Sequence, residues 1–479
     1  MIPMTLAEIA EVVGGDVVGD PAFVVTGPAF VDSRQVQAGG LFVAVVGERV
    51  DGHDYAAGAV AAGASAVLGS RATEVATVVV PDPVAALGLL ARHVLDALPG
   101  LVVVAMTGSQ GKTGTKDYLA QVLAAAGPTV ATLGNLNNEL GVPLTVLRVT
   151  EETRFLVVEM GARGIGHITY LCGIAPPSVA AVLNVGTAHV GEFGSRQAIA
   201  VAKGEILEAL PADGVAVIND DDALTTVMDA RTNARVVRFG LTDRPDVTWT
   251  GVSYDDLDRP SGVLHVFGEQ RPVTLRQSGE HQLLNAGAAA ALAHAAGVGT
   301  DDIAARLSDA TGLSAWRMEL HEVPDGPVVI NDAYNANPAS MRAAISTLRA
   351  IAGRRGARSI ALLGEMLELG SDADDDHRAL GAHAVDAGVD VLLVVGEAAR
   401  PMLQGAANVT PARGTAMFVA DRAAALAWLR ENTDANDVVL VKASRAAGLE
   451  WVAHGLTEGD HASAQDDGPR PDQMEETQG

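Results

Sequence analysis

The pattern of apolar and polar positions along the chain predicts short buried strands that alternate with amphipathic helices. Apolar runs rich in β-branched residues at 102–107, 155–158 and 179–183 have the length of buried strands, and a polar loop follows each of them. Stretches with helical spacing lie between such runs. This alternation is typical of a mostly parallel sheet covered by helices, so the pattern predicts an α/β fold.

The same pattern divides the chain into three units. Residues 1–99 are predicted to form a small α/β domain, residues 100–312 a central domain with a mostly parallel sheet and a β-rich segment at 240–278, and residues 313–456 a doubly wound, Rossmann-like domain. A length of 479 residues is too great for one core and agrees with several domains. Residues 457–479 are strongly acidic and rich in Pro, Gly, Gln and Ser, so we expect a disordered tail there.

Composition and charge narrow the class of protein. The net charge of −26 argues against nucleic acid or an anionic membrane as the main partner. The single cysteine, Cys172, cannot form an internal disulfide and suits a reducing compartment. The chain shows no basic leader segment and no apolar run of about 18 residues. We therefore expect a soluble cytoplasmic protein, acting as a monomer.

A phosphate-binding loop is predicted where the strand at 102–107 ends. The loop and the start of a helix place backbone N–H groups and a positive helix dipole together, which suits a cluster of anionic oxygens. Lys112 would contact the β- and γ-phosphates of a nucleotide, and the Thr113 hydroxyl would bind Mg²⁺. The spacing departs from the usual motif, because Met106 stands where its first glycine belongs. The expected contact residues are Thr107, Gly108, Ser109, Gln110, Gly111, Lys112 and Thr113.

Other polar residues follow neighbouring strands. Glu159 comes directly after a buried strand, at the edge where a parallel sheet would hold Mg²⁺ beside a phosphate loop. His189 follows the strand at 179–183 and is either a metal ligand or an ordinary turn histidine. Lys203 lies in an expected helix at 195–210, where the pattern alone favours a solvated surface lysine. Ser33 and Arg34 either bind a phosphate or simply close a turn.

Nine short motifs together resemble the Mur ligases, the ATP-dependent amide-forming enzymes of peptidoglycan precursor synthesis. They occur in family order over about residues 5–456 and read T-G-S-Q-G-K-T, G-N-L-N-N-E-L-G-V-P, V-V-E-M-G, N-V-G-T-A-H-V-G-E-F-G-S, A-K-G-E-I, G-E-H-Q-L-L-N, W-R-M-E, D-A-Y-N-A-N-P and G-E-M-L-E-L-G. The second, eighth and ninth most resemble the member that adds a terminal dipeptide. The resemblance implies UDP-N-acetylmuramoyl-tripeptide and D-alanyl-D-alanine as substrates, and a role in cell wall biogenesis, cell shape and cell division.

The resemblance also implies a mechanism and its catalytic residues. The family moves the γ-phosphoryl group of ATP onto a peptide carboxylate, and an amine then attacks the acyl phosphate. Lys112 would hold the phosphates. Thr113, Glu159, His189 and Lys203 match the positions that hold two Mg²⁺ ions, Lys203 as a carbamate, so the resemblance replaces the surface reading of Lys203.

Further matches assign the remaining ligand contacts. The nucleotide would lie between the second and third units and contact Asn285, Arg317, Asp332, Tyr334, Asn335 and Asn337. The sugar–peptide acceptor would lie between the first and second units and contact Ser33, Arg34, Asn135, Asn137 and Asn138. Gln282 is a departure, since many members carry Asn after the motif histidine. We expect the third unit to stand away from the phosphate loop until ligands bind.

Three alternatives remain open. A sibling ligase that adds a single amino acid, or a folylpolyglutamate or cyanophycin-type enzyme, would share the central domain. A P-loop kinase or NTPase would share the loop but would not need three α/β units. A non-catalytic nucleotide-binding protein of this fold is disfavoured by the presence of Lys112, Glu159, His189 and Lys203 together.

Overall fold

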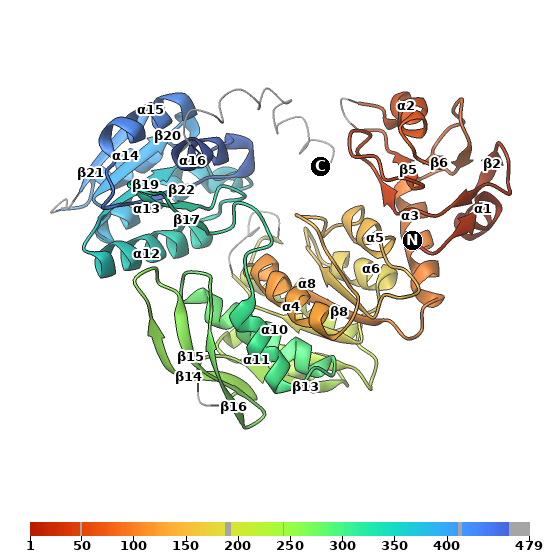
Figure 1. The fold of residues 1–479 in the computed structure, drawn as a ribbon, viewed down its shortest axis with the longest axis horizontal. Coiled ribbons are helices and arrows are strands. Elements are labelled where there is room, and N and C mark those ends of the chain that lie inside the picture. The colour runs from red at the N-terminus through yellow and green to blue at the C-terminus, as the bar shows by residue number, and fades with distance from the viewer. Residues whose placement is uncertain (48–49, 187–192, 243, 411–413, 459–479) are drawn as a thin grey trace.

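The computed structural model describes residues 1–458, apart from 48–49, 187–192, 243 and 411–413. Its sheets are mostly parallel and covered by helices, which confirms the predicted α/β class (Figure 1). The last helix runs to Thr457, so the start of the expected tail at 457 is one residue early, and the rest of that tail from 459 lies outside the described residues. No helix in the described part of the chain is long and apolar enough to cross a membrane.

The first unit is built on a five-stranded sheet in the order β2-β7-β6-β5-β4. Its first helix is capped at the N-terminus by Thr5, whose side chain accepts from the Glu8 backbone N–H in a capping box, and at the C-terminus by Gly14, which lies in the left-handed region. Its last helix is capped by Asp82 and leads into the second unit. The elements are β1 (Met4–Thr5), α1 (Leu6–Val13), β2 (Asp16–Val18), β3 (Val24–Val25), β4 (Ala29–Phe30), β5 (Leu41–Ala44), α2 (Ala56–Ala61), β6 (Ala66–Gly69), β7 (Thr77–Val79) and α3 (Pro83–Asp96).

The second unit carries a nine-stranded sheet in the order β16-β15-β14-β13-β12-β11-β8-β10-β9. The strands from β9 to β14 pair in parallel, and β14, β15 and β16 pair in antiparallel fashion. The elements are β8 (Val102–Thr107), α4 (Lys112–Ala126), β9 (Thr129–Ala131), α5 (Gly141–Val146), β10 (Phe155–Glu159), α6 (His167–Ile174), β11 (Val179–Val182), α8 (Arg196–Glu208), β12 (Val215–Asn219), α9 (Ala223–Thr226), β13 (Arg235–Phe239), β14 (Val247–Tyr254), β15 (Pro260–Val266), β16 (Glu269–Thr274), α10 (His281–Ala295) and α11 (Thr300–Asp309).

The register of this sheet brings its functional loops together. Strand β8 lies between β10 and β11, with Glu159 opposite Met106 and Val182 opposite Thr107. The carboxyl ends of three parallel strands therefore meet at one edge, where ligands bind in open α/β sheets. The Ala-rich helix α10 packs against α4, which lies directly behind the loop.

The third unit has a six-stranded sheet in the order β17-β18-β22-β19-β20-β21. All pairs are parallel except β17 with β18, so the doubly wound expectation holds with one antiparallel edge strand. The elements are β17 (Glu319–Glu322), β18 (Val328–Asn331), α12 (Pro338–Arg355), β19 (Arg358–Leu363), α13 (Ala373–Asp386), β20 (Val391–Val395), α14 (Pro401–Ala407), β21 (Thr415–Val419), α15 (Arg422–Asn432), β22 (Asp437–Lys442) and α16 (Glu450–Thr457).

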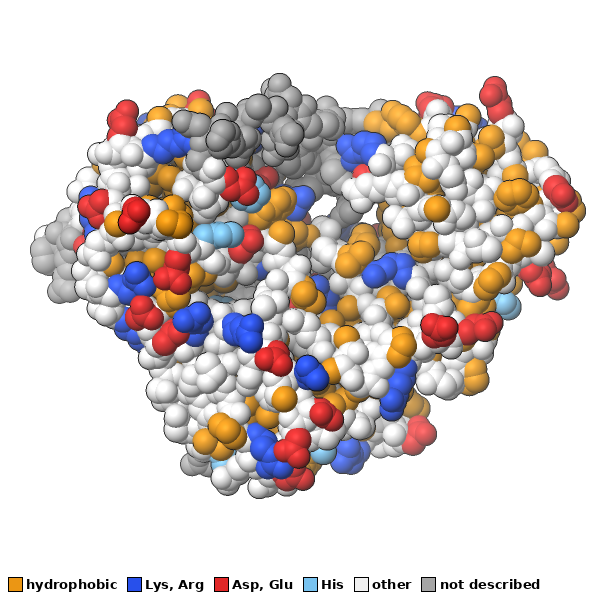
Figure 2. Space-filling view, in the orientation of Figure 1, with side chains coloured by type: hydrophobic (Ala, Val, Ile, Leu, Met, Phe, Trp, Pro, Cys, Tyr) orange, Lys and Arg blue, Asp and Glu red, His pale blue; other side chains and the backbone are white. Residues whose placement is uncertain are grey.

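On the face seen in Figure 2, Lys and Arg side chains are interspersed with Asp and Glu side chains.

Candidate functional site

The loop between β8 and α4 has the shape that the sequence predicts for a phosphate site. Gly111 adopts a φ of 78°, in the left-handed region that favours glycine, and α4 begins at the next residue. A Cβ at Gly111 would lie 2.6 Å from Asn285 Oδ1, and one at Gly114 would lie 2.7 Å from Asn285 Nδ2. The two glycines therefore let Asn285 of α10 pack directly against the start of α4.

Asn184, which the sequence reasoning did not assign to the site, orders this loop. Its Oδ1 accepts from the Gln110 backbone N–H at 2.9 Å, and its Nδ2 donates to the Gln110 carbonyl at 3.0 Å. Ser109 Oγ accepts from the Gly186 backbone N–H at 2.9 Å. The sequence signal that could have identified Asn184 is its position as an amide residue just after the strand that pairs with β8.

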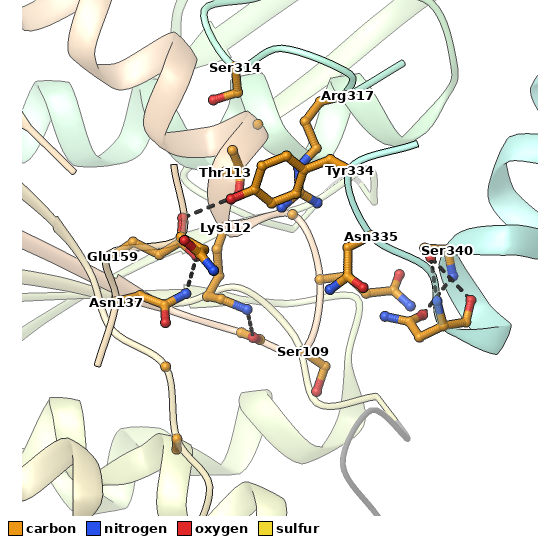
Figure 3. A pocket seen from close by; sticks show the side chains of 18 of the residues that line it. Ser109, Lys112, Thr113, Asn137, Glu159, Ser314, Arg317, Tyr334, Asn335 and Ser340 are labelled. Atoms are coloured by element: carbon orange, nitrogen blue, oxygen red, sulfur yellow. Dashed lines mark hydrogen bonds between the residues drawn. The ribbon is translucent and has the colours of Figure 1, made fainter. Parts of the chain in front are cut away.

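Lys112, Thr113 and Glu159 meet at the centre of the site (Figure 3). Lys112 Nζ donates to the Gly108 carbonyl at 2.8 Å, so the lysine lies along its own loop. Thr113 Oγ1 donates to Glu159 Oε2 at 3.3 Å. Desolvation lowers the pKa of Lys112, the Arg317 charge lowers it further, and the Glu159 carboxylate opposes both effects.

Glu159 is held from several sides. Asn137 Nδ2 donates to Glu159 Oε1 at 2.9 Å, and the Glu159 backbone N–H donates to Thr132 Oγ1 at 3.0 Å. The residue is only 2% exposed. The Glu159 carboxylate is buried and its side-chain hydrogen-bond donors are neutral. Together with the Thr113 hydroxyl it provides hard oxygen ligands, which suit Mg²⁺. Among the described residues, no three or more His, Cys, Asp or Glu side chains are grouped so that they could hold a metal ion, and His189 lies outside these residues.

Lys203 is buried, so its surface reading from the pattern is wrong. It lies in α8 at 6% exposure and lines the same cavity as Lys112. Burial, with a smaller contribution from the Lys112 charge, lowers the pKa of Lys203 to about 7. A substantial fraction of the amine is therefore neutral near pH 7.

The third unit supplies a second wall that faces the phosphate loop. Arg317 lies over the Tyr334 ring with its Cζ 4.1 Å from the ring centroid (Figure 3). Arg317 Nε is buried and has no hydrogen-bond partner among the described residues, as expected of a donor reserved for a ligand. The expectation that the third unit stands away from the phosphate loop is not met here, since Arg317, Asn335 and Lys112 all line one cavity.

Asp332 and Lys442 form a buried ion pair at the ends of adjacent strands β18 and β22. Their charged atoms are 2.6 Å apart, and Lys442 Nζ also donates to the Asn335 carbonyl at 2.8 Å. Burial lowers the pKa of Lys442, and Asp332 opposes that shift. Asp332 Oδ1 also accepts from the Met318 backbone N–H at 3.1 Å, which ties the loop after Arg317 to the sheet.

Two of the predicted ligand-contact residues also make hydrogen bonds that stabilise the local fold. Asn337 caps α12, and its Oδ1 accepts from the Ser340 backbone N–H at 2.9 Å. Asn138 Oδ1 accepts from the Gly141 backbone N–H at 2.8 Å, which closes the turn before α5. Both residues still line the cavity.

One cavity of about 1040 Å³ brings most of the predicted site together. It reaches from the phosphate loop to Arg317 and Tyr334 in the third unit and to Asp82 and Val84 in the first. Of the described candidates, Thr107, Ser33 and Arg34 do not line it. Thr107 is buried in β8.

Ser33 and Arg34 lie in a turn of the first unit. Arg34 Nε donates to Asp32 Oδ1 at 2.9 Å, and the Arg34 backbone N–H donates to the same oxygen at 3.0 Å. Half of the Arg34 side chain is exposed. These contacts support the interpretation that Ser33 and Arg34 close a turn. Their binding of a phosphate stays a prediction.

This chain belongs to the Mur ligase family. Residues 30–93 match the Mur ligase family catalytic domain, residues 106–293 the Mur ligase middle domain, and residues 316–445 the Mur ligase glutamate ligase domain. These segments include the phosphate loop, Glu159, Lys203 and Arg317, so the family match covers the site just described.

Its relatives include UDP-N-acetylmuramoyl-tripeptide–D-alanyl-D-alanine ligases. The chain is 47% identical to the one from Mycobacterium bovis, over 96% of this chain and 99% of that protein, and 35% identical to the one from Escherichia coli over the same shares. A crystal structure of MurF from Acinetobacter baumannii is 32% identical, with a TM-score of 0.83, and covers 95% of this chain and 99% of that one. MurF from Thermotoga maritima in complex with ADP has a TM-score of 0.77 at 30% identity, over 91% of this chain and 98% of that one.

Proposed function

We propose that this chain joins the terminal carboxylate of UDP-N-acetylmuramoyl-tripeptide to the amine of D-alanyl-D-alanine, with conversion of ATP to ADP and phosphate. The observation that carries the proposal is the shared cavity, which places a phosphate loop, a buried carboxylate and an unpaired arginine donor around one space bordered by all three units. The names of the relatives supply the substrates. The reaction belongs to cytoplasmic peptidoglycan precursor synthesis.

The residues of the cavity support activation of a carboxylate by phosphorylation. A carboxylate oxygen attacks the γ-phosphorus, the bond to the β-phosphate oxygen breaks, and ADP leaves. The dipeptide amine then attacks the carbonyl carbon of the acyl phosphate, loses a proton, and phosphate departs. Lys112 and the N–H groups of residues 108–113 hold the phosphates, and Arg317 approaches them from the third unit. Most of the catalytic effect is positioning and charge neutralisation.

Magnesium fits the oxygen ligands of the site. When bound, it would neutralise the phosphate oxygens and hold them in one geometry. Thr113 and Glu159 would hold it, and the family pattern adds His189 and Lys203. We propose that two Mg²⁺ ions bind here, because the family resemblance implies two.

A carbamate on Lys203 would complete this ligand set. An unmodified ammonium beside Lys112 and the metals would be repelled, whereas a carbamate adds a negative charge. Carbamate formation requires a neutral amine, and the lowered pKa of Lys203 provides one.

The nucleotide and the acceptor are proposed to bind at different ends of the cavity. The nucleotide contacts Asn285, Arg317, Asp332, Tyr334, Asn335 and Asn337, and the acceptor contacts Asn135, Asn137 and Asn138, with its uridine diphosphate near Ser33 and Arg34. We also propose that the three domains span residues 1–99, 100–312 and 313–456 and that the protein is a monomer.

The test is phosphate release from ATP with Mg²⁺ and the muramoyl tripeptide, comparing D-alanyl-D-alanine with single amino acids as the amine. We expect turnover with the dipeptide alone. Turnover with a single amino acid would identify a sibling ligase, and turnover without any amine would identify an NTPase.

A further inference from the structure

The linker between the second and third units, residues 310–318, is fastened to α4, the helix that begins at Lys112. The Gln121 side chain binds both backbone groups of Thr311, because its Nε2 donates to the Thr311 carbonyl at 2.9 Å and its Oε1 accepts from the Thr311 N–H at 3.0 Å. Gln121 Nε2 also donates to the Asp117 carbonyl of its own helix at 2.9 Å. The start of the linker is therefore fixed to α4 at two points.

A second attachment lies farther along the linker, at Ser314. Asp117 Oδ2 accepts from the Ser314 backbone N–H at 3.1 Å, and Asp117 Oδ1 accepts from Ser314 Oγ at 3.0 Å. Lys116 Nζ lies 2.7 Å from Asp117 Oδ1 and donates to Ser314 Oγ at 3.2 Å. Lys116 and Asp117 are 4% and 3% exposed, and charged hydrogen-bonding groups interact more strongly when they are shielded from water. Ser314 is therefore held against α4 by both its backbone and its side chain.

Arg317 follows this attachment in a backbone that large residues rarely adopt. Trp316 and Met318 on either side of it have φ values of 59° and 51°, in the left-handed region that is strained for bulky side chains. Such a conformation persists only where the surroundings fix it. The Met318 N–H donates to Asp332 Oδ1 at 3.1 Å. Arg317 is thus held between Ser314, which α4 fixes, and Met318, which the third unit fixes.

The two attachments act against a repulsion. Arg317 and Lys112 bring two positive charges to one cavity (Figure 3). Burial lowers the pKa of Lys112, and the nearby Arg317 charge lowers it further. The guanidinium stacks on Tyr334, and its buried Nε has no hydrogen-bond partner among the described residues. The position of Arg317 near another cation therefore depends on Tyr334 and on the linker.

We propose that Asp117 and Gln121 are positioning residues, which hold the linker so that Arg317 stays close to Lys112 and can bind the nucleotide phosphates together with it. The inference rests on the proposed function, which assigns both cations to these phosphates. One helix then carries the phosphate-binding lysine at its start and fixes the arginine from its later turns. Because the two cations are already in place, ordering the linker costs little of the binding free energy.

The test measures the dissociation constants of AMP-PNP with Mg²⁺ and of AMP by calorimetry. AMP lacks the β- and γ-phosphates, so its binding does not use the contact assigned to Arg317. The variants are S314A, Q121A and the double variant S314A/Q121A, each of which shortens a side chain at one attachment. They keep the buried pair of Lys116 and Asp117, so no buried charge is left unpaired.

D256A is the matched control. It removes another contact between the second and third units, the hydrogen bond from Arg355 to Asp256 at 2.9 Å, and leaves the linker unchanged. D256A and the wild-type chain are expected to bind AMP-PNP equally well.

The double variant should bind AMP-PNP roughly 10-fold more weakly, the effect of weakening a hydrogen bond to a charged group. Its affinity for AMP should change by less than about 2-fold. R317A should lose at least as much affinity for AMP-PNP. Adding S314A and Q121A to R317A should then cause no further loss beyond about 2-fold, because the linker acts through Arg317.

Four outcomes would overturn the proposal. Unchanged affinity for AMP-PNP in the double variant would mean that the attachments are not needed. Equal losses for AMP-PNP and AMP would mean that they only support the fold. A further loss in the R317A background would mean that they act on another group, and an equal loss in D256A would mean that any weakened contact between the units is enough. Failure of the proposed function is distinct, because it appears in turnover with D-alanyl-D-alanine, which this binding experiment does not use.

Discussion

Two buried lysines show how the surroundings of a residue decide its chemistry. Lys116 is 4% exposed, and its Nζ lies 2.7 Å from Asp117 Oδ1. Lys203 is 6% exposed and has no acidic partner among the described residues. Burial without a counter-charge lowers the pKa of an amine, as it does for Lys203. This difference supports the proposed carbamate at Lys203.

This difference predicts carbamylation at one lysine. With ¹³C-bicarbonate, the wild-type chain should show a carbamate carbon resonance that K203R lacks and K116R keeps. The signal should grow as the pH rises from about 6 to 8, because the reactive neutral amine becomes populated through a pKa of about 7. A resonance that persists in K203R, or one absent from the active wild-type chain, would contradict the carbamate.

At the scale of elements, the turn between β14 and β15 joins the second unit to the third (Figure 1). Leu257 in this turn is 2% exposed and packs in the core of the third unit with Met341 and Ile345 of α12. Asp256 accepts from Arg355 of α12 at 2.9 Å, and Asp258 contacts Arg354. The hairpin therefore anchors α12, which follows the loop at 332–337 on the cavity wall.

Truncation of this anchor should destabilise the protein. L257A is expected to lower the free energy of unfolding by about 2–5 kcal/mol, the usual effect of removing a buried leucine side chain. V252A, in the same hairpin but at 37% exposure, should change it by less than about 0.5 kcal/mol. Urea unfolding measures both. Equal small effects would mean that the turn lies on the third unit without contributing to its core.

The hairpin also shows where sequence reasoning ends. The alternating pattern predicted a β-rich segment at 240–278, and β14, β15 and β16 confirm it. The pattern did not predict that Leu257 enters another core, because that contact joins residues far apart in the sequence. Periodicity specifies which side of an element is apolar and does not specify which partner covers it.

The site shows the same limit. The strand-then-loop pattern was enough to predict the phosphate loop and Glu159, since parallel strands bring their carboxyl ends to one edge. Lys203 was read as exposed from its helix pattern and needed the family resemblance, because its burial depends on elements far away in the sequence. Asn184 acts through contacts with residues far away in the sequence and was not assigned at all.

At the scale of the whole molecule, three units contribute to one reaction space. The second unit supplies the phosphate loop and Glu159, the third supplies Arg317, and the first closes one end with Asp82. The linker to the third unit is tied to α4, because Ser314 Oγ donates to Asp117 Oδ1 at 3.0 Å. The segment that leads into the third unit therefore contacts the helix that begins at Lys112.

In the proposed reaction, this space activates a carboxylate by phosphorylation and passes it to the dipeptide amine. The most direct measurement uses muramoyl tripeptide with ¹⁸O in its terminal carboxylate, together with ATP, Mg²⁺ and D-alanyl-D-alanine, and follows the label by mass spectrometry. One ¹⁸O should appear in the released phosphate and one should stay in the new amide for each bond formed. Phosphate without label, or phosphate released without amide formation, would contradict the account.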